Sequence, residues 1–399
     1  MLKRKLYIPK VTFFILIFCF GTIHKIESQE RRNNPNFVSD NKGTYRYMSF
    51  KTHLGTHFYT GKSLDDELKG GYKSIEFRYA WQNSNPEHWT NKYYNGVSYG
   101  LGIYTAYIGT PGVVGTPTAL FSFINFPHKN LSKKTRIITD GALGVLYDSN
   151  YYHATKNPKN DSIGSPFSIY VNIGLGFESI LTRNIDLIYG LDYTHFSNGR
   201  LTVPNYGLNM LGVNLGLKYH YNKDAKYNDP YISQERFKRY PNLAAPKDLK
   251  QCINILTAFG TVQNGFQETV NESLETDKFY TFSGYIEYQL NFNVKHGLDA
   301  GLDLFYDGSL ANIYKETKDR YLYAYHFGYN YTFGKMLLKL DLGGYMGPNG
   351  NKGKEDLWTR AALQYRLFDW FGFHLGLKTK QGFSADWAEF GLIFQPFKW

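Results

Sequence analysis

The sequence predicts an all-β protein, a transmembrane antiparallel β-barrel of roughly 12–16 strands that follows a cleaved signal peptide. Three observations predict it. Alternation of apolar and polar residues recurs from Val97 to the C-terminus. The composition is 18% aromatic, with 35 Tyr, 30 Phe and 39 Gly against only 14 Pro, and aromatic girdles are typical of membrane barrels. The chain also begins with an export signal.

Residues 1–28 form the expected signal peptide. Lys3, Arg4 and Lys5 precede an apolar stretch from Val11 to Ile23, and we expect cleavage before Gln29. The stretch is too short for a membrane-spanning helix, which needs roughly 20 apolar residues. We therefore expect export without a helical anchor, and a mature chain, residues 29–399, with a single cysteine and no disulfide framework.

The balance of charge favours a lipid partner. The formal net charge is +11, and removing the five basic residues and the one acidic residue of the signal leaves +7. A basic protein suits nucleic acid or an anionic membrane surface. Because an exported protein does not meet nucleic acid, we expect a phosphate-bearing lipid to be the partner. The sequence gives no indication of an oligomeric state.

The alternating runs are long enough to cross a membrane. Residues 321–333 place an aromatic at every odd position, and residues 97–107 and 357–367 repeat the style. Transmembrane strands need about 9 to 11 residues, whereas strands of soluble sandwiches average about 5 to 6, so length favours a barrel over a secreted sandwich. The terminal aromatic, Trp399, resembles the last-strand signal of outer-membrane proteins, so we expect the bacterial outer membrane. Roughly sixteen candidate strands lie near residues 44–51, 73–82, 98–108, 117–125, 135–147, 167–181, 184–196, 208–221, 252–263, 279–292, 297–306, 321–333, 335–346, 357–367, 370–378 and 385–395.

Residues 29–399 are expected to form one barrel. It comprises a region with the chemical motif, residues 95–221, a long polar loop, residues 222–251, and further strands over residues 252–399. Two eight-stranded barrels divided at the loop are the alternative. We favour one barrel, because the segments before and after the loop share one strand style without a convincing repeat.

A serine and a histidine continue the apolar row of one strand. Over residues 185–197 the odd positions are apolar or aromatic up to His195 and Ser197. Side chains alternate along a strand, so these two polar groups share the lipid-facing row. A serine hydroxyl needs a base to accept its proton, and the base needs an orienting acceptor. Asn209 opens the same row on the next strand, so the candidate catalytic residues are His195, Ser197 and Asn209.

The nearby carboxylates occupy even-numbered positions, so they lie on the strand face opposite to His195 and cannot orient it. Glu178, Asp186 and Asp192 fall on the opposite row and are expected to point into the lumen. An asparagine amide is therefore the candidate orienter, a role that asparagine fills in some cysteine hydrolases.

The loop after the strand supplies candidate groups that shape the site. The backbone at Asn198 and Gly199, or the guanidinium of Arg200, could stabilise the negative charge of an ester-hydrolysis intermediate. Gly199 and Gly207 let the chain bend, and Asn205 marks a turn with Pro204. The alternative is a polar loop at a barrel rim without chemistry.

This pattern resembles a known family. His195-x-Ser197-Asn198, followed by Pro204-Asn205-x-Gly207, is similar to the outer-membrane lipid A 3-O-deacylases, also called acyloxyacyl hydrolases. The resemblance implies a β-barrel serine esterase that removes an ester-linked acyl chain from lipid A and so remodels lipopolysaccharide. It also implies a His, a Ser two residues later, and a Glu fourteen residues beyond the His. This chain has Asn209 at that last position.

A second resemblance leaves an alternative open. His195-x-Ser197-Asn198-Gly199-Arg200 with Asn209 is also similar to outer-membrane phospholipase A, which implies a Ser-His-Asn triad and calcium. We favour the deacylase and expect no cofactor for it, with Ca²⁺ only under the phospholipase alternative. The remaining histidines lack metal-ligand spacing, so we expect no metal site. A barrel channel or binding protein without enzymatic activity is the third hypothesis.

Overall fold

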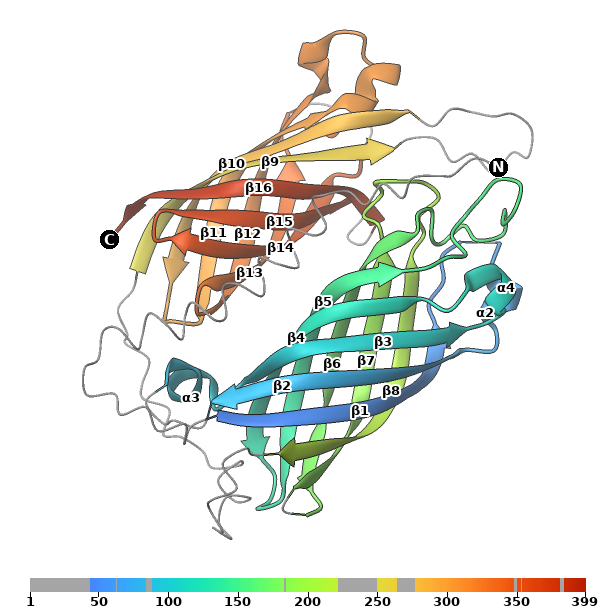
Figure 1. The fold of residues 1–399 in the computed structure, drawn as a ribbon. Helices are drawn as coiled ribbons and strands as arrows, with labels where there is room; N and C mark the ends of the chain where they lie inside the picture. Colours follow the sequence, from blue (N-terminus) through green and yellow to red (C-terminus); the bar gives the residue numbers. More distant parts are fainter. Residues whose placement is uncertain are drawn as a thin grey trace, which may run out of the picture.

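The computed structural model contains sixteen antiparallel strands that close into two separate eight-stranded barrels (Figure 1). It describes residues 44–61, 63–83, 88–182, 184–221, 250–263, 277–347, 350–352, 354–380 and 384–399. The expected signal peptide, residues 1–28, and nearly all of the expected polar loop lie outside the described residues.

The first barrel closes where β8 pairs with β1, from Arg46 opposite Tyr221 to His57 opposite Met210. Its strands are β1 (Thr44–His57), β2 (Tyr72–Asn83), β3 (Ser98–Ile108), β4 (Thr118–Asn130), β5 (Thr135–Tyr147), β6 (Phe167–Ile180), β7 (Ile185–Ser197) and β8 (Leu208–Tyr221).

The second barrel closes where β16 pairs with β9, and Phe390 lies opposite Phe259 in that pairing. Its strands are β9 (Lys250–Gln263), β10 (Lys278–Asn291), β11 (His296–Asp307), β12 (Tyr321–Phe333), β13 (Met336–Tyr345), β14 (Leu357–Phe368), β15 (Phe371–Lys380) and β16 (Ser384–Lys398).

The predicted strands are confirmed, but the preference for a single barrel is wrong. All sixteen candidate ranges fall on strands. Fourteen agree with the observed bounds within three residues, and β1 and β4 extend six and five residues beyond the expected ends. Alternation reports which face of a strand is apolar, and it does not report which strands pair at the point of closure. Eight strands enclose an interior just wide enough to be filled by side chains, so each half of the chain closes by itself.

The two faces of each strand are segregated as the alternation predicts. On β8, Leu211, Leu215 and Leu217 point outward with 41%, 56% and 50% of their surface exposed. Lys218 and His220, on the opposite row, are buried in the lumen. An apolar exterior and a polar interior are the arrangement of a transmembrane barrel.

Ion pairs fill both lumens. In the first barrel Arg78 lies 2.6 Å from Glu76 and 3.1 Å from Asp140. In the second, Arg360 lies 2.8 Å from Glu389 and 3.1 Å from Asp303 and from Asp341, and these three partners are buried. Side chains and ion pairs therefore fill the interior that the described strands enclose. A filled interior does not support the channel hypothesis.

Connections differ in length between the two ends of each barrel. In the first barrel one end carries residues 58–71, 109–117, 148–166 and 198–207, with the short helices α2 (Asp65–Leu68) and α4 (Pro111–Val114). The other end carries the tight turns 131–134 and 181–184, and the connection with α3 (Trp89–Tyr94). The second barrel has the 3₁₀ helices η2 (Gly308–Asn312) and η3 (Thr317–Arg320) at its long-connection end, opposite the turns 292–295, 334–335 and 369–370. Bacterial outer-membrane barrels place short turns toward the periplasm and longer loops outside.

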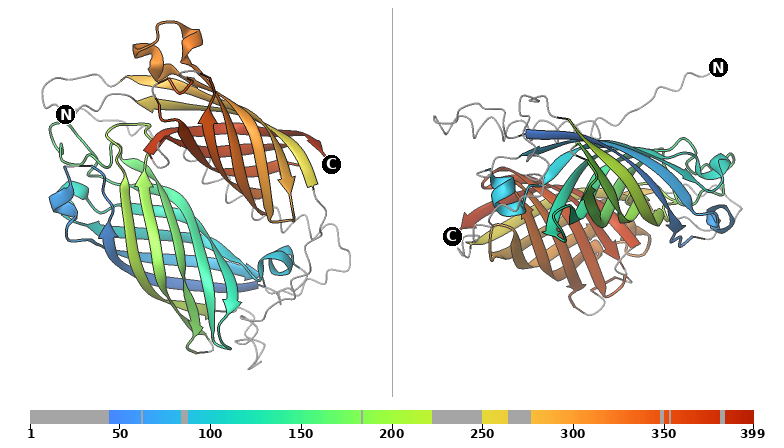
Figure 2. Two further views of the ribbon diagram at one scale, coloured as in Figure 1. Left: turned by 180° about the vertical axis from the view of Figure 1, so that it is seen from behind. Right: turned by 90° about the horizontal axis from the view of Figure 1, so that it is seen from below.

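The barrels lie side by side and point the same way (Figure 2). At the short-turn ends, the Tyr94 hydroxyl donates to the Thr332 carbonyl, and Trp89 packs on Phe333 with ring centroids 4.9 Å apart. At the long-connection ends, Val203 N–H donates to Gln263 Oε1 at 2.9 Å. Like ends therefore meet, as one membrane requires. Among the described residues, no helix combines the length and the hydrophobicity that a membrane span needs.

Candidate active site

The outward orientation of His195 and Ser197 is fixed by the residue between them. Phe196 points inward and is fully buried, and its ring lies 6.0 Å from that of Tyr104 and 5.8 Å from that of Tyr170. A strand cannot slip by one residue without turning this anchored ring out to lipid. The aromatic packing inside the barrel thus holds the two polar groups on the outer face, as the sequence predicts.

Asn209 lies directly opposite His195 in the pairing of β7 with β8. Its Oδ1 accepts from His195 Nδ1 at 2.7 Å and from the Tyr193 hydroxyl, also at 2.7 Å. With the Nδ1 proton used in this way, the other ring nitrogen, Nε2, is left as the basic atom. The predicted orienting contact is present, and Tyr193 adds a second donor to the same amide oxygen.

The Ser197 hydroxyl is the acceptor for two N–H donors of the loop that follows it. Gly199 N–H donates to Ser197 Oγ at 3.0 Å, and Asn205 Nδ2 donates at 3.3 Å. The Asn205 amide is oriented because its Oδ1 accepts from Asn198 N–H at 3.0 Å. Both donors converge on the serine oxygen, so they lie near any carbonyl group that this oxygen attacks.

Glycine is required at position 207. Its φ is +73°, and a Cβ there would lie 3.2 Å from His195 Cε1, 3.4 Å from Ser197 Cβ and 2.9 Å from the Phe196 carbonyl oxygen. The bend at Gly207 brings the loop back against His195 and Ser197, and a side chain at position 207 would crowd both residues. Its N–H donates to the Ser162 carbonyl at 3.0 Å, so the loop over residues 148–166 supports the bend from behind.

The structure places Arg200 beside the second barrel. Its guanidinium points toward the second barrel, with Nη1 3.8 Å from Asp386 Oδ1, and the two donors at Ser197 come from Gly199 and Asn205 instead. The reason is backbone geometry. Gly199 and Arg200 both adopt positive φ, 64° and 65°, and this turn carries the chain away from the serine toward the neighbouring barrel.

The carboxylates excluded by parity do lie in the lumen. Glu178, Asp186 and Asp192 are all buried there. None of the hydrogen bonds of the described residues joins His195 to Ser197, whose hydroxyl faces its two loop donors. Catalytic hydrogen bonds are often formed only in the substrate complex.

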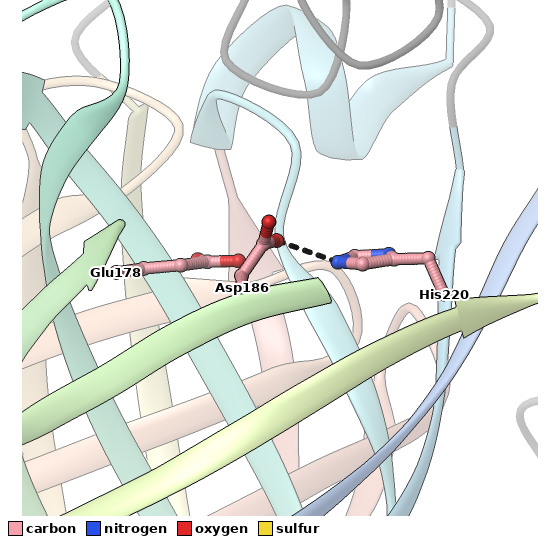
Figure 3. Close-up of side chains that lie close together, drawn as sticks. All are labelled: Glu178, Asp186 and His220. Carbon is pink, nitrogen blue, oxygen red and sulfur yellow. Dashed lines mark hydrogen bonds and ion pairs between the residues drawn. The ribbon is translucent and has the colours of Figure 1, made fainter. Parts of the chain in front are cut away.

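Glu178, Asp186 and His220 come close enough together to resemble a metal site (Figure 3). His220 Nε2 lies 2.6 Å from Asp186 Oδ2. Glu178 is already matched by two cations, with Arg136 Nη2 at 2.7 Å on one oxygen and Lys218 Nζ at 2.7 Å on the other. A divalent ion would add charge to a group that is already balanced, so we interpret this cluster as lumen packing.

A second group of this kind, in the other barrel, has the same character. Glu287, Asp299 and His326 are close neighbours. Lys339 Nζ already lies 2.8 Å from Glu287 and 2.6 Å from Asp299, in the place that a cation would occupy.

Sequence reasoning missed two residues at the site. Tyr193 precedes His195 by two positions, so the parity argument that found His195 could also have found it. Gln263 lies at the end of β9, in the other barrel, and contacts the loop after Ser197 at two points. No local pattern in the sequence indicates that contact.

Two family models match the chain. Residues 75–218, from β2 to β8, match the family described as lipid A 3-O-deacylase (PagL). Residues 252–399, the second barrel, match the C-terminal domain of acyloxyacyl hydrolase. The chain belongs to the lipid A 3-O-deacylase, or acyloxyacyl hydrolase, family. It is an ester hydrolase of the outer membrane, in the family that removes an acyl chain from lipid A.

Three solved structures are similar to this chain, each at low sequence identity. The outer-membrane enzyme PagL is 13% identical, with a TM-score of 0.30, over 42% of this chain and 97% of that one. Neisserial surface protein A is also 13% identical, with a TM-score of 0.30, over 44% and 97%. A Rhodopseudomonas blastica porin is 9% identical, with a TM-score of 0.16, over 88% and 99%. None of the curated proteins compared with the chain matches it. The assignment rests on the family models.

Proposed function

We propose that Ser197, His195 and Asn209 carry the deacylation of lipid A, with Ser197 as nucleophile, His195 as general base and Asn209 as orienter. The observation that carries the proposal is the 2.7 Å contact between His195 Nδ1 and Asn209 Oδ1 on the outer face of the first barrel. It leaves Nε2 available to a serine two residues along the same row.

In the first half-reaction, Ser197 turns from its loop donors to His195, and Nε2 takes the hydroxyl proton as Oγ attacks the ester carbonyl carbon. The carbonyl oxygen becomes an oxyanion, which the Gly199 N–H and the Asn205 amide stabilise. The carbon–oxygen bond to the sugar then breaks, and the imidazolium returns its proton to the departing alcohol. The acyl chain remains esterified to Ser197.

In the second half-reaction, a water molecule attacks the acyl-enzyme. His195 accepts a proton from the water, the same donors stabilise the second oxyanion, and the proton returns to Ser197 Oγ as the fatty acid leaves. The Asn209 amide keeps the imidazole in one tautomer throughout. As a neutral group it stabilises imidazolium less than a carboxylate does, so we expect modest turnover.

The position of the triad suits a lipid substrate. His195 and Ser197 lie at the long-connection end of β7, in the outer row of the first barrel and not in its filled lumen. Ser197 is 7% exposed because the loop that follows it covers the hydroxyl, so a lipid ester approaches it from the outer side of the barrel, past this loop. We expect a membrane-embedded enzyme whose partner is lipid A, and no interaction with nucleic acid.

Asn209 is the observation that favours a second candidate, an outer-membrane phospholipase A. That enzyme would release fatty acid from glycerophospholipids and depend on calcium. The two candidates share the triad and differ in substrate.

Mass spectrometry of lipid A and of phospholipids from cells that make this protein tests the proposal. Cells that make Ser197→Ala are the control. We expect lipid A to lose one acyl chain only with the intact serine. Lysophospholipid without a change in lipid A would assign the phospholipase instead, and deacylation that persists with Ser197→Ala would overturn the roles given to the triad.

A further inference from the structure

The two barrels meet at the active-site loop. The segment from Gly199 to Val203 begins two residues after the nucleophile and includes the Gly199 oxyanion donor. A Cβ on Gly199 would lie 3.4 Å from Ala388 Cβ and 3.5 Å from Leu377 Cδ1, so the loop rests against β15 and β16. The loop is thus in van der Waals contact with a barrel that has no part of the triad.

Gln263 holds this segment at both ends. Its backbone N–H donates to the Arg200 carbonyl at 3.2 Å, and its side-chain Oε1 accepts from Val203 N–H at 2.9 Å. Gln263 is 7% exposed, so water does not compete freely for these bonds. One residue of the second barrel therefore fixes the loop at two points three residues apart.

A third contact continues the interface. The Arg200 guanidinium lies 3.8 Å from Asp386, which is 2.7 Å from Lys378 and 2.8 Å from Lys354. Asp386 is anchored inside the second barrel by these two lysines, so Arg200 is directed to a fixed carboxylate rather than a mobile one.

We infer that the second barrel is a scaffold for the catalytic loop, and that Gln263 is a positioning residue for the Gly199 and Asn205 donors. The inference rests on the proposed function, because it assigns Gln263 an effect on the oxyanion hole. A second barrel that only anchored the protein in the membrane would not need hydrogen bonds to this segment. Misplacement of a catalytic group by about 1 Å can lower a rate by about 100-fold.

Fatty-acid release from lipid A by the purified full-length protein tests the inference. We expect Gln263→Ala to lower kcat by about 10- to 100-fold with little change in KM. Reaction of Ser197 with a fluorophosphonate probe should slow in parallel, because that probe also places an oxygen in the oxyanion hole. Gln263→Glu should recover most of the rate, since a carboxylate oxygen still accepts from Val203 N–H.

A matched control lies on the same strand. Gln251 is at the opposite end of β9 and accepts from Tyr288 and Trp399, so Gln251→Ala should leave kcat unchanged. Wild-type kcat and probe reactivity in Gln263→Ala, with Ser197→Ala inactive, would overturn the inference alone. Full activity of Ser197→Ala in the same assay would overturn the proposed function with it. Equal losses in Gln263→Ala and Gln263→Glu, matched by equal losses of folded protein, would reduce Gln263 to a structural residue and also overturn the inference.

Discussion

The seventh strand of each barrel carries a histidine, and the two histidines face opposite ways. His195 of β7 points outward, where Asn209 orients it. His374 of β15 points into the lumen, where it lies 3.2 Å from Glu389 and 3.2 Å from Gln364. The residue type is the same, but the row and the height along the barrel differ. His195 is the eleventh residue of β7, at its long-connection end, and His374 is the fourth residue of β15, near the short-turn end. A buried lumen histidine serves packing, whereas an outward histidine beside a serine can meet a lipid ester.

The outer rows of the two barrels show the same contrast. Toward the long-connection end, β7 replaces apolar residues with His195 and Ser197. The outer row of β15 continues there with Leu375 and Leu377, and its last member, Thr379, bonds to Thr359 of β14. The proposed chemistry therefore depends on a short polar interruption of one apolar row, which the otherwise similar strand of the second barrel lacks.

The largest expected difference between the barrels comes from removing each histidine. His195→Ala should lower the rate of deacylation by at least about 1,000-fold while the thermal midpoint stays near that of the wild type, because a general base is lost and a lipid-facing position accepts alanine. His374→Ala should lower the free energy of unfolding by about 1 to 3 kcal/mol, because its buried partners lose a hydrogen bond, with the rate per folded molecule kept.

Fatty-acid release and heat denaturation in detergent, measured on both variants, test this contrast. An equally strong loss of rate per folded molecule in His374→Ala and His195→Ala would contradict the different roles given to the two histidines.

A smaller effect is expected at the orienting residue. Asn209→Ala should lower kcat by about 10- to 100-fold, because the imidazole loses the acceptor that selects its tautomer. Asn209→Glu should keep or raise kcat, since a carboxylate accepts from His195 and stabilises imidazolium better than an amide. Steady-state kinetics on lipid A check both variants. Equal rates for Asn209→Ala and the wild type would show that Asn209 has no part in orienting His195.

The last prediction concerns stability alone, at two rim carboxylates, one in each barrel. Asp148 follows β5, and its burial raises the pKa of this carboxyl from 3.8 to about 6, although Asn150 N–H donates to Oδ1. Asp307 ends β11 and pairs with Lys354 at 2.8 Å. A raised folded-state pKa means that the folded protein binds the proton more tightly, so stability falls as pH rises from about 4 to about 6 and stays lower above that range.

Asp148→Asn should therefore raise the free energy of unfolding at pH 7.5 by up to about 3 kcal/mol, and the thermal midpoint should rise with it. This gain in stability should vanish near pH 4. Asp307→Asn should lower the midpoint at pH 7.5, because it removes one partner of an ion pair. Melting curves at the two pH values measure both. A gain for Asp148→Asn that is the same at pH 4 and pH 7.5 would contradict the assigned cause.

The strands, and the outward placement of the three residues proposed as a triad, could be predicted because both depend on local parity. The period of two along residues 185–197 and 209–221 was enough to place His195, Ser197 and Asn209 in outward rows and Glu178 and Asp186 in the lumen. The number of barrels could not be predicted in this way, because closure depends on which distant strands pair. The contacts of Arg200 and Gln263 could not be predicted for the same reason. They cross between two barrels, and no local sequence pattern specifies the relative position of these barrels.

The central claim is that the first barrel carries out the chemistry through Ser197. The most direct test is the rate of fatty-acid release from lipid A by purified Ser197→Ala, measured beside the wild type with both proteins shown to be folded. The account predicts a rate at least about 1,000-fold below that of the wild type. Equal rates for the two proteins would contradict it.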